Sequence, residues 1–131
     1  MIIEKLAWIE LQNGKILSTL SKGKSVYYIP GGKREKGEND QEALLREIEE
    51  ELSVSIIPSS MEYMETFEAQ ADGKAKGVIV KMICYKAEYK GDLQANSEID
   101  HFTWLSYEDI DRVAAVDKII FNWLKERKLL S

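Results

Sequence analysis

The sequence contains only one cysteine, Cys84, and one histidine, His101, among its 131 residues. A single cysteine cannot form an intramolecular disulfide and excludes a four-cysteine zinc site. A lone histidine has no histidine partner for a metal site, so we interpret His101 as a surface or hydrogen-bonded strand residue. Cys84 lies in an apolar stretch, where a thiol packs as a small hydrophobic side chain rather than serving as a nucleophile.

Basic residues and long apolar runs are also scarce. Eighteen Lys and Arg against 23 Asp and Glu give a net charge of -5, whereas nucleic acid polymers and anionic membranes bind clustered positive charge. No run reaches the roughly 18 apolar residues of a membrane helix, and Glu4, Lys5 and Glu10 interrupt the first twelve residues. We therefore expect a cytoplasmic protein that binds neither nucleic acid polymers nor membranes, and whose ligand is a small molecule.

The composition is that of an ordinary globular protein, with 44% hydrophobic and 31% charged residues. A chain of this length is expected to form a single domain over residues 1–131. The dipeptide Asn13-Gly14 predicts a hairpin between strands at 5–12 and 15–22. Further strands are expected at 25–29, 54–58, 62–70, 77–89 and 101–106.

Two helices are expected among these strands. Asn39 is a good N-cap and Glu42 follows three residues later, as in a capping box. Apolar residues then recur at helical spacing up to Leu52, and residues 115–130 form a second amphipathic pattern. The predicted fold class is therefore α/β (α+β), with mixed strands and two helices in layers.

The segment from Gly31 to Leu52 concentrates eight acidic side chains in one loop and one helix. With Ile48 at the centre of the apolar stripe, Glu51, Glu47 and Glu50 lie at roughly -60°, -100° and -160° on the helical wheel. Carboxylates three and four residues apart repel one another, so this flank favours a counter-ion. Mg²⁺ is the natural candidate because it prefers hard oxygen ligands, and Mn²⁺ is a substitute.

A solvated, glutamate-rich helix face is the alternative interpretation, and it would be the commoner one for an isolated helix. The preceding loop argues against it here. Pro30 and two glycines end a strand, and the chain then returns to Glu38 at the start of the helix. Such a loop can approach a metal or a phosphate, with Lys33 and Arg34 as phosphate ligands.

Nine positions in this region carry a family resemblance. The pattern is Gly32, five residues, Glu38, seven residues, Arg46-Glu47-Ile48, one residue, Glu50-Glu51 and the aliphatic Val54 three positions later. It resembles the Nudix box of the Nudix hydrolases, in particular MutT-like members. Eight of the nine specified positions match, and the exception is Ser53, where the pattern has glycine. A serine there costs on the order of 1 kcal/mol if it adopts the left-handed conformation of that glycine.

The resemblance implies an αβα sandwich around a mixed sheet and a metal-dependent hydrolase. Glu47, Glu50 and Glu51 would bind Mg²⁺ together with the backbone carbonyl of Gly32. Arg46 would orient these carboxylates, and Glu38 would fix the loop or bind a further ion. In MutT-like relatives a glutamate from the region of Glu98 binds metal or assists the attacking water, so Glu98 is a candidate for either role; a surface glutamate is the alternative.

The resemblance also suggests a substrate class, a nucleoside diphosphate linked to a group X. Residues typical of relatives that cleave ADP-ribose or diadenosine polyphosphates are missing, which favours a nucleoside triphosphate, including oxidised or non-standard ones, cut to the monophosphate and pyrophosphate. Tyr28 and Phe67 are candidates for stacking on the base, although aromatic residues in strands more often belong to the core. Alternatives are a nucleotide sugar as substrate or a non-catalytic nucleotide-binding module. A monomer or a homodimer is expected.

Overall fold

The computed structural model describes residues 1–71 and 73–131. The elements are β1 (Ile2–Trp8), β2 (Leu11–Gln12), β3 (Lys15–Ser21), β4 (Gly31–Gly32), α1 (Asp40–Leu52), β5 (Ser55–Ile56), the 3₁₀ helix η1 (Pro58–Ser60), β6 (Glu62–Gln70), β7 (Ile79–Lys86), β8 (Tyr89–Lys90), β9 (Ile99–Leu105), the 3₁₀ helix η2 (Tyr107–Arg112) and α2 (Ala115–Glu126). Strands and two α-helices mixed along the chain confirm the predicted α+β class.

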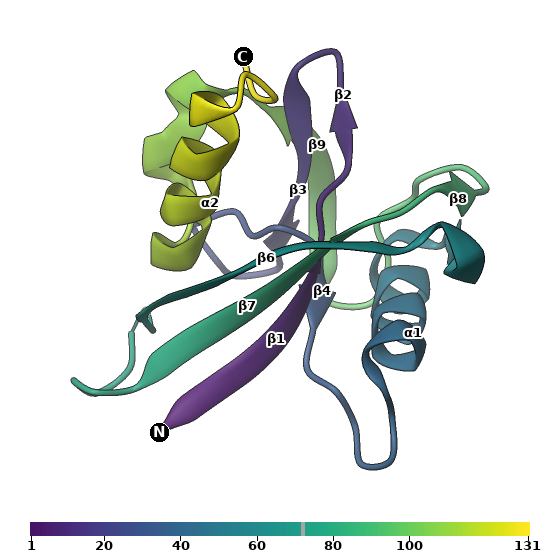
Figure 1. The fold of residues 1–131 in the computed structure, drawn as a ribbon, viewed down its shortest axis with the longest axis horizontal. Coiled ribbons are helices and arrows are strands. Elements are labelled where there is room, and N and C mark those ends of the chain that lie inside the picture. Colours follow the sequence, from purple (N-terminus) through teal and green to yellow (C-terminus); the bar gives the residue numbers. More distant parts are fainter. Residues whose placement is uncertain (72) are drawn as a thin grey trace.

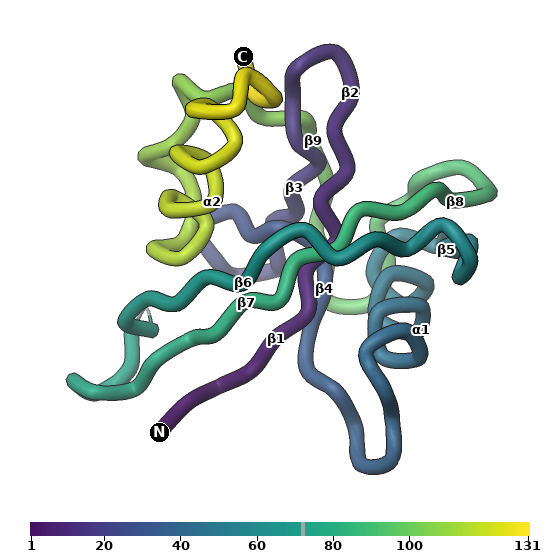
Figure 2. Tube along the Cα trace, in the orientation of Figure 1, coloured from purple at the N-terminus to yellow at the C-terminus, as the bar shows by residue number. Residues whose placement is uncertain are grey.

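The strands form a four-stranded sheet, a three-stranded sheet and a two-stranded ladder. The order in the largest sheet is β4-β1-β7-β6, where β1 and β7 run parallel and the other neighbours run antiparallel. The second sheet has the order β2-β3-β9, and β5 pairs with β8. Figures 1 and 2 show the two α-helices on either side of the long strands. The mixed sheet between helices agrees with the predicted layering.

The predicted hairpin forms, but with a shorter first strand than expected. Asn13 and Gly14 both have positive φ, 54° and 75°, as a two-residue turn between β2 and β3 requires. The expected strand at 5–12 divides near Ile9, whose amide donates to the Tyr85 carbonyl, while the next residue, Glu10, accepts from Leu17. The chain therefore passes from the first sheet to the second at this point, and β1 pairs with β7 rather than with β3.

The strand expected at 25–29 is not formed. Tyr28 exchanges backbone hydrogen bonds with Thr19, whereas Tyr27 donates to the Arg112 carbonyl and accepts from the Ala114 amide. Because adjacent residues bond to different elements, no ladder can extend along this segment. The segment instead ties β3 to the start of α2.

Other predicted boundaries shift, and the strand expected at 101–106 is observed as β9 at Ile99–Leu105. The segment 54–58 divides between β5 and η1, and 77–89 divides between β7 and β8. The second helix ends at Glu126 rather than at residue 130, because Lys128 has a φ of 60° and Leu129 donates back to Leu124. The 3₁₀ helix η2 was not predicted.

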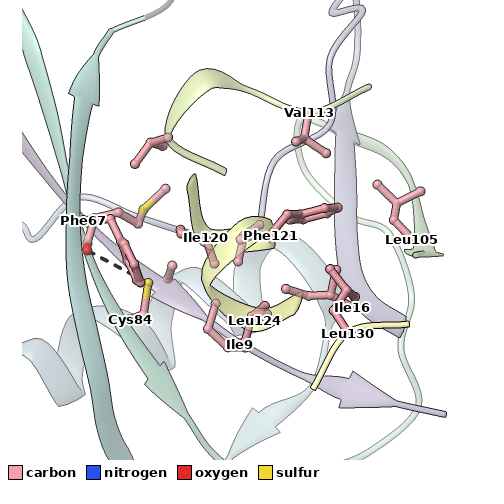
Figure 3. Close-up of a cluster of buried hydrophobic side chains, with 14 residues drawn as sticks. Ile9, Ile16, Phe67, Cys84, Leu105, Val113, Ile120, Phe121, Leu124 and Leu130 are labelled. Atoms are coloured by element: carbon pink, nitrogen blue, oxygen red, sulfur yellow. Dashed lines mark hydrogen bonds between the residues drawn. The ribbon is translucent and has the colours of Figure 1, made fainter. Parts of the chain in front are cut away.

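Alternation along β1 distributes its side chains between two apolar clusters. Leu6 and Trp8 pack with the buried face of α1, whereas Ala7 and Ile9 pack with α2. Figure 3 shows the second cluster, in which Phe121 and neighbouring side chains of α2 face the strands. Each helix therefore covers one face of the same strand, and none of the described helices is long and apolar enough to cross a membrane.

Candidate functional site

The acidic helix α1 begins and ends as local chemistry requires. Asn39 and Glu42 exchange side-chain to backbone hydrogen bonds of 2.8 and 3.0 Å, which confirms the capping box. The helix ends at Ser53, which has a φ of 62° and donates its amide to the Glu49 carbonyl. A serine thus bears the left-handed conformation for which glycine is better suited.

The two glycines before the loop are required by close packing. A β-carbon on Gly31, whose φ is 147°, would lie 1.9 Å from the Leu6 carbonyl oxygen. A β-carbon on Gly32 would lie 2.5 Å from the carboxyl carbon of Glu47. Only glycine lets the backbone of β4 come this close both to β1 and to the acidic flank of α1.

Arg46 organises the loop and the acidic flank together. Its guanidinium donates to both carboxylate oxygens of Glu38 at 2.8 Å, to Glu47 at 2.9 Å and to the Lys33 carbonyl at 3.0 Å. Hydrogen bonds from Arg46 and from the Glu35 amide lower the pKa of Glu38 to about 2. Arg46 therefore joins the loop to a carboxylate of the acidic flank, and Glu38 closes the loop. The orienting role of Arg46 stays a prediction.

Glu51 is a buried carboxylate in an acidic neighbourhood. Its side chain is 7% exposed and accepts a hydrogen bond of 3.1 Å from the Gly31 amide. Burial raises the pKa of Glu51 to about 8, the Gly31 hydrogen bond opposes this, and the charges of Glu47, Glu98 and Glu50 raise it further. Burial also raises the pKa of Glu47, against the effect of Arg46.

Glu98 approaches this flank from a separate loop. The Asn96 amide donates to the Glu51 carbonyl and the Gln94 amide to the Leu52 carbonyl, both at 2.9 Å, so the loop is fixed on the C-terminal end of α1. These bonds occupy carbonyls that a helix end leaves without helical partners. Glu98 is thereby close enough for its charge to raise the pKa of both Glu47 and Glu51.

The acidic side chains border a cavity of about 480 Å³. Glu47, Glu51 and Glu98 line it together with Gly32 and Lys33. One part of its wall is apolar or aromatic and comes from β1, β7, the segment before β4 and the start of α2: Ile3, Val80, Met82, Tyr28, Ile29, Ala114 and Val116. Further polar side chains line it as well: Lys5, Thr19, Ser21, Lys24, Gln70 and Lys74. Its volume and its mixed lining are typical of a small-molecule site.

The predicted phosphate and base ligands divide into two groups. Lys33 and Tyr28 are among the described residues that line the cavity, whereas Arg34 and Phe67 are not. Arg34 forms ion pairs with Glu4 and Asp40. Phe67 is 9% exposed in the core and its ring lies edge-on to Trp123, with centroids 5.6 Å apart.

The carboxylates are engaged by donors of the protein itself. Glu47 is bonded to Arg46, and Glu51 to the Gly31 amide. Glu50 is half exposed and lies 3.6 Å from Arg46. Within residues 1–71 and 73–131, no three His, Cys, Asp or Glu side chains converge closely enough to hold a metal ion.

Two residues of this region were not selected from the sequence. Asp117 of α2 is fully buried and accepts a 2.8 Å hydrogen bond from the Ile29 amide, so it holds the segment before β4. Its position in an amphipathic helix gave no signal of this role. Lys5 of β1 lines the cavity, and its place in a strand of alternating burial could have indicated an inward direction.

Comparison with models of known protein families shows to which family the chain belongs. The model of the NUDIX domain matches residues 6–124. The chain belongs to the Nudix family. The fold, the mixed sheet and the hydrolase class inferred from the box agree with this membership. No curated protein matches the chain.

Several solved structures resemble the chain over nearly its whole length. The E. coli ORF135 protein is 27% identical, with a TM-score of 0.74 over 96% of this chain and 91% of that one. A MutT NUDIX hydrolase from Burkholderia pseudomallei is 20% identical, with a TM-score of 0.75 over 92% and 95%. A UDP-X diphosphatase is 20% identical, with a TM-score of 0.70 over 97% of this chain and 64% of that one. The last two likenesses concern the fold alone.

Proposed function

We propose that this Nudix protein is a Mg²⁺-dependent pyrophosphohydrolase of a nucleoside diphosphate linked to a group X. The preferred substrate is a nucleoside triphosphate, cut to the monophosphate and pyrophosphate. One observation carries the proposal: three carboxylates, of Glu47, Glu51 and Glu98, and the ammonium of Lys33 border the same cavity, whose wall also has an apolar and aromatic part. The charged part suits a metal-bound diphosphate, and the apolar part suits a nucleoside.

The residues fit a divalent cation by their chemistry. Glu47, Glu50, Glu51 and the Gly32 carbonyl offer the hard oxygen ligands that Mg²⁺ and Mn²⁺ take. The neighbouring negative charges that raise the pKa of Glu51 would be balanced by such an ion. When bound, the ion would neutralise charge on the diphosphate oxygens and favour ionisation of a water molecule.

Each side chain of the box then has a task of its own. Arg46 and Glu38 hold the loop and keep Glu47 in place, since one guanidinium bonds to both carboxylates. Lys33, next to Gly32, binds phosphate oxygens by charge. Glu98 accepts a proton from the attacking water or supplies a further ligand, and it does so from outside the helix.

The test is a nucleotide panel assayed with Mg²⁺, with Mn²⁺ and with chelator. The panel contains the nucleoside triphosphates, oxidised and non-standard triphosphates, ADP-ribose and UDP-glucose, and the products are separated by ion-exchange chromatography. We expect release of monophosphate and pyrophosphate from triphosphates with Mg²⁺ and none with chelator. Faster cleavage of UDP-glucose would move the substrate to nucleotide sugars. Binding without turnover of every nucleotide would refute the proposal.

A further inference from the structure

Lys5 lies on β1 and lines the cavity. The strand β1 pairs with β7 along its whole length but with β4 only at Leu6 and Ala7, so Lys5 has a partner strand on one side. Lys5 pairs with Met82 of β7 and, with Ile3, lines the cavity on the face of the sheet that α2 covers. The residue is half-buried, and its charged end lies at the cavity wall.

The protein supplies only a weak contact. The ammonium of Lys5 lies 5.8 Å from the ring centroid of Tyr28, a cation–π distance. Within the described residues, the ion pairs formed by lysines are those of Lys81 and Lys86, and Lys5 takes part in none. An ammonium has three donors and no acceptor. Its hydrogen-bonding capacity therefore remains available to a ligand in the cavity.

The surroundings determine what that ligand must offer. The neighbouring cavity wall on β1 and β7 consists of Ile3, Val80 and Met82, and Val116 contributes from α2. These side chains contact a planar or apolar group but do not direct it by hydrogen bonds. On the part of the wall formed by β1 and β7, Lys5 is thus a polar group among apolar side chains, whereas Thr19, Ser21, Lys24, Gln70 and Lys74 line other parts of the cavity. Such polar groups fix the orientation of a ligand.

We propose that Lys5 is a specificity-determining residue that donates a hydrogen bond to the head group of the substrate. It selects head groups that present a carbonyl oxygen, such as the keto edge of hypoxanthine, guanine or uracil. Adenine and cytosine present an amino group at the corresponding position, where donor would meet donor and the ammonium would lose hydration without a partner. This inference rests on the proposed function and names its substrate class.

The experiment compares two matched pairs of triphosphates, ITP with ATP and UTP with CTP, in wild type, Lys5→Met and Lys81→Met. Methionine keeps the length and the packing of the lysine stem without its charge. Lys81 is the matched control because it lies on the adjacent strand, pairs with Glu4 and faces the opposite side of the sheet. Thermal unfolding of each variant verifies that it is folded.

We expect the wild type to favour the keto member of each pair by about tenfold or more in kcat/KM, the scale of a hydrogen bond to a charged group. Lys5→Met should reduce the ratio to about one, mainly by raising KM for the keto substrates, and Lys81→Met should leave it unchanged. A wild-type ratio near one in both pairs, or an unchanged ratio in Lys5→Met, overturns the inference while the hydrolase stands.

If none of the four nucleotides is turned over, the full nucleotide panel decides separately on the proposed function. The dissociation constants of the same nucleotides, measured by calorimetry with Mg²⁺, then decide on Lys5. Weaker binding of ITP and UTP by about tenfold in Lys5→Met would uphold its role. Equal constants in both proteins, or no binding to either, would overturn it.

Discussion

Glu51 on α1 and Asp117 on α2 are buried carboxylates that hold the same short segment from opposite sides of the sheet. Glu51 accepts from the Gly31 amide and Asp117 from the Ile29 amide. Their surroundings differ. Glu51 borders the cavity near three other glutamates, whereas Asp117 is fully buried. The pKa of the Cys84 thiol is raised mainly by burial of the thiol and further by the charge of Asp117.

The contrast separates two uses of a buried acid. A carboxylate gathered with like charges at the edge of a cavity is unfavourable for the fold alone and favours a cation. A carboxylate that contacts a backbone amide deep in the core satisfies a donor that burial would otherwise leave unpaired. We therefore expect substitutions of Glu51 to affect turnover and those of Asp117 to affect stability.

The largest effect is expected from Glu51→Gln, which keeps the size of the side chain and removes its charge. Turnover with Mg²⁺ should fall by at least about two orders of magnitude, as for loss of a key electrostatic group. The fold should persist, since the amide oxygen can still accept from the Gly31 amide. Near-normal turnover of the purified variant would remove Glu51 from the proposed ligands.

Asp117→Ala should instead lower the free energy of unfolding, by about 1–3 kcal/mol, because the buried Ile29 amide loses its acceptor. Asp117→Asn, which retains an acceptor oxygen, should lose less. Urea unfolding measures both variants. The proposed difference between Glu51 and Asp117 would be contradicted by an unchanged free energy of unfolding in Asp117→Ala. It would also be contradicted if the folded Asp117→Ala variant lost as much kcat as Glu51→Gln.

Glu98→Gln tests a carboxylate that reaches the acidic flank from a loop outside α1. Its turnover should fall by about tenfold or more, the low end of general acid–base effects, with nucleotide binding less affected. Asp92→Asn, an exposed position earlier in the same loop, should change neither quantity. Steady-state kinetics and calorimetry provide the two measurements. Normal turnover of Glu98→Gln would show that another residue serves as the general base or further ligand.

The smallest effect is expected from Ser53→Gly at the end of α1. Glycine adopts the observed φ of 62° without the strain of a side chain, so the variant should gain about 1 kcal/mol in the free energy of unfolding. Turnover should stay the same, because no proposed ligand changes. A loss of stability, measured by urea unfolding, would indicate that the serine compensates for the strain in some other way.

Local signals in the sequence predicted much of the fold. Asn13-Gly14 gave the turn, Asn39 with Glu42 gave the start of α1, and the strand at 62–70 has the predicted bounds. Long-range pairing was not predictable in this way. The parallel partnership of β1 with β7 and the divided hydrogen bonding of Tyr27 and Tyr28 depend on residues far away in the chain.

In the candidate site, too, local features were predictable from the sequence and long-range contacts were not. The spacing of Glu47, Glu50 and Glu51 on one helix placed them on a common flank, because helical geometry is local. The ion pairs that draw Arg34 away from the cavity depend on β1 and α1, and the bond from Ile29 to Asp117 spans 88 residues. Such contacts become visible only once the elements are packed together.

The central claim is that the acidic flank of α1 holds a divalent cation, and the dependence of stability on pH and Mg²⁺ tests it most directly. Glu51 has a pKa of about 8 in the folded protein and an ordinary value of 4.5. Between these values the folded protein binds more protons than the unfolded chain, so its free energy of unfolding should fall as pH rises through this window.

On the proposed function, Mg²⁺ binds the deprotonated, folded protein and raises its free energy of unfolding by RT ln(1 + c/Kd), where c is the concentration of free Mg²⁺. The measurement is urea unfolding of wild type and Glu51→Gln between about pH 5 and pH 8, with chelator and with excess Mg²⁺. We predict that Mg²⁺ stabilises the wild type by an amount that grows as pH rises, and that Glu51→Gln loses both this gain and most of the decline seen with chelator. Equal free energies of unfolding with and without Mg²⁺ at every pH in the wild type would contradict the account.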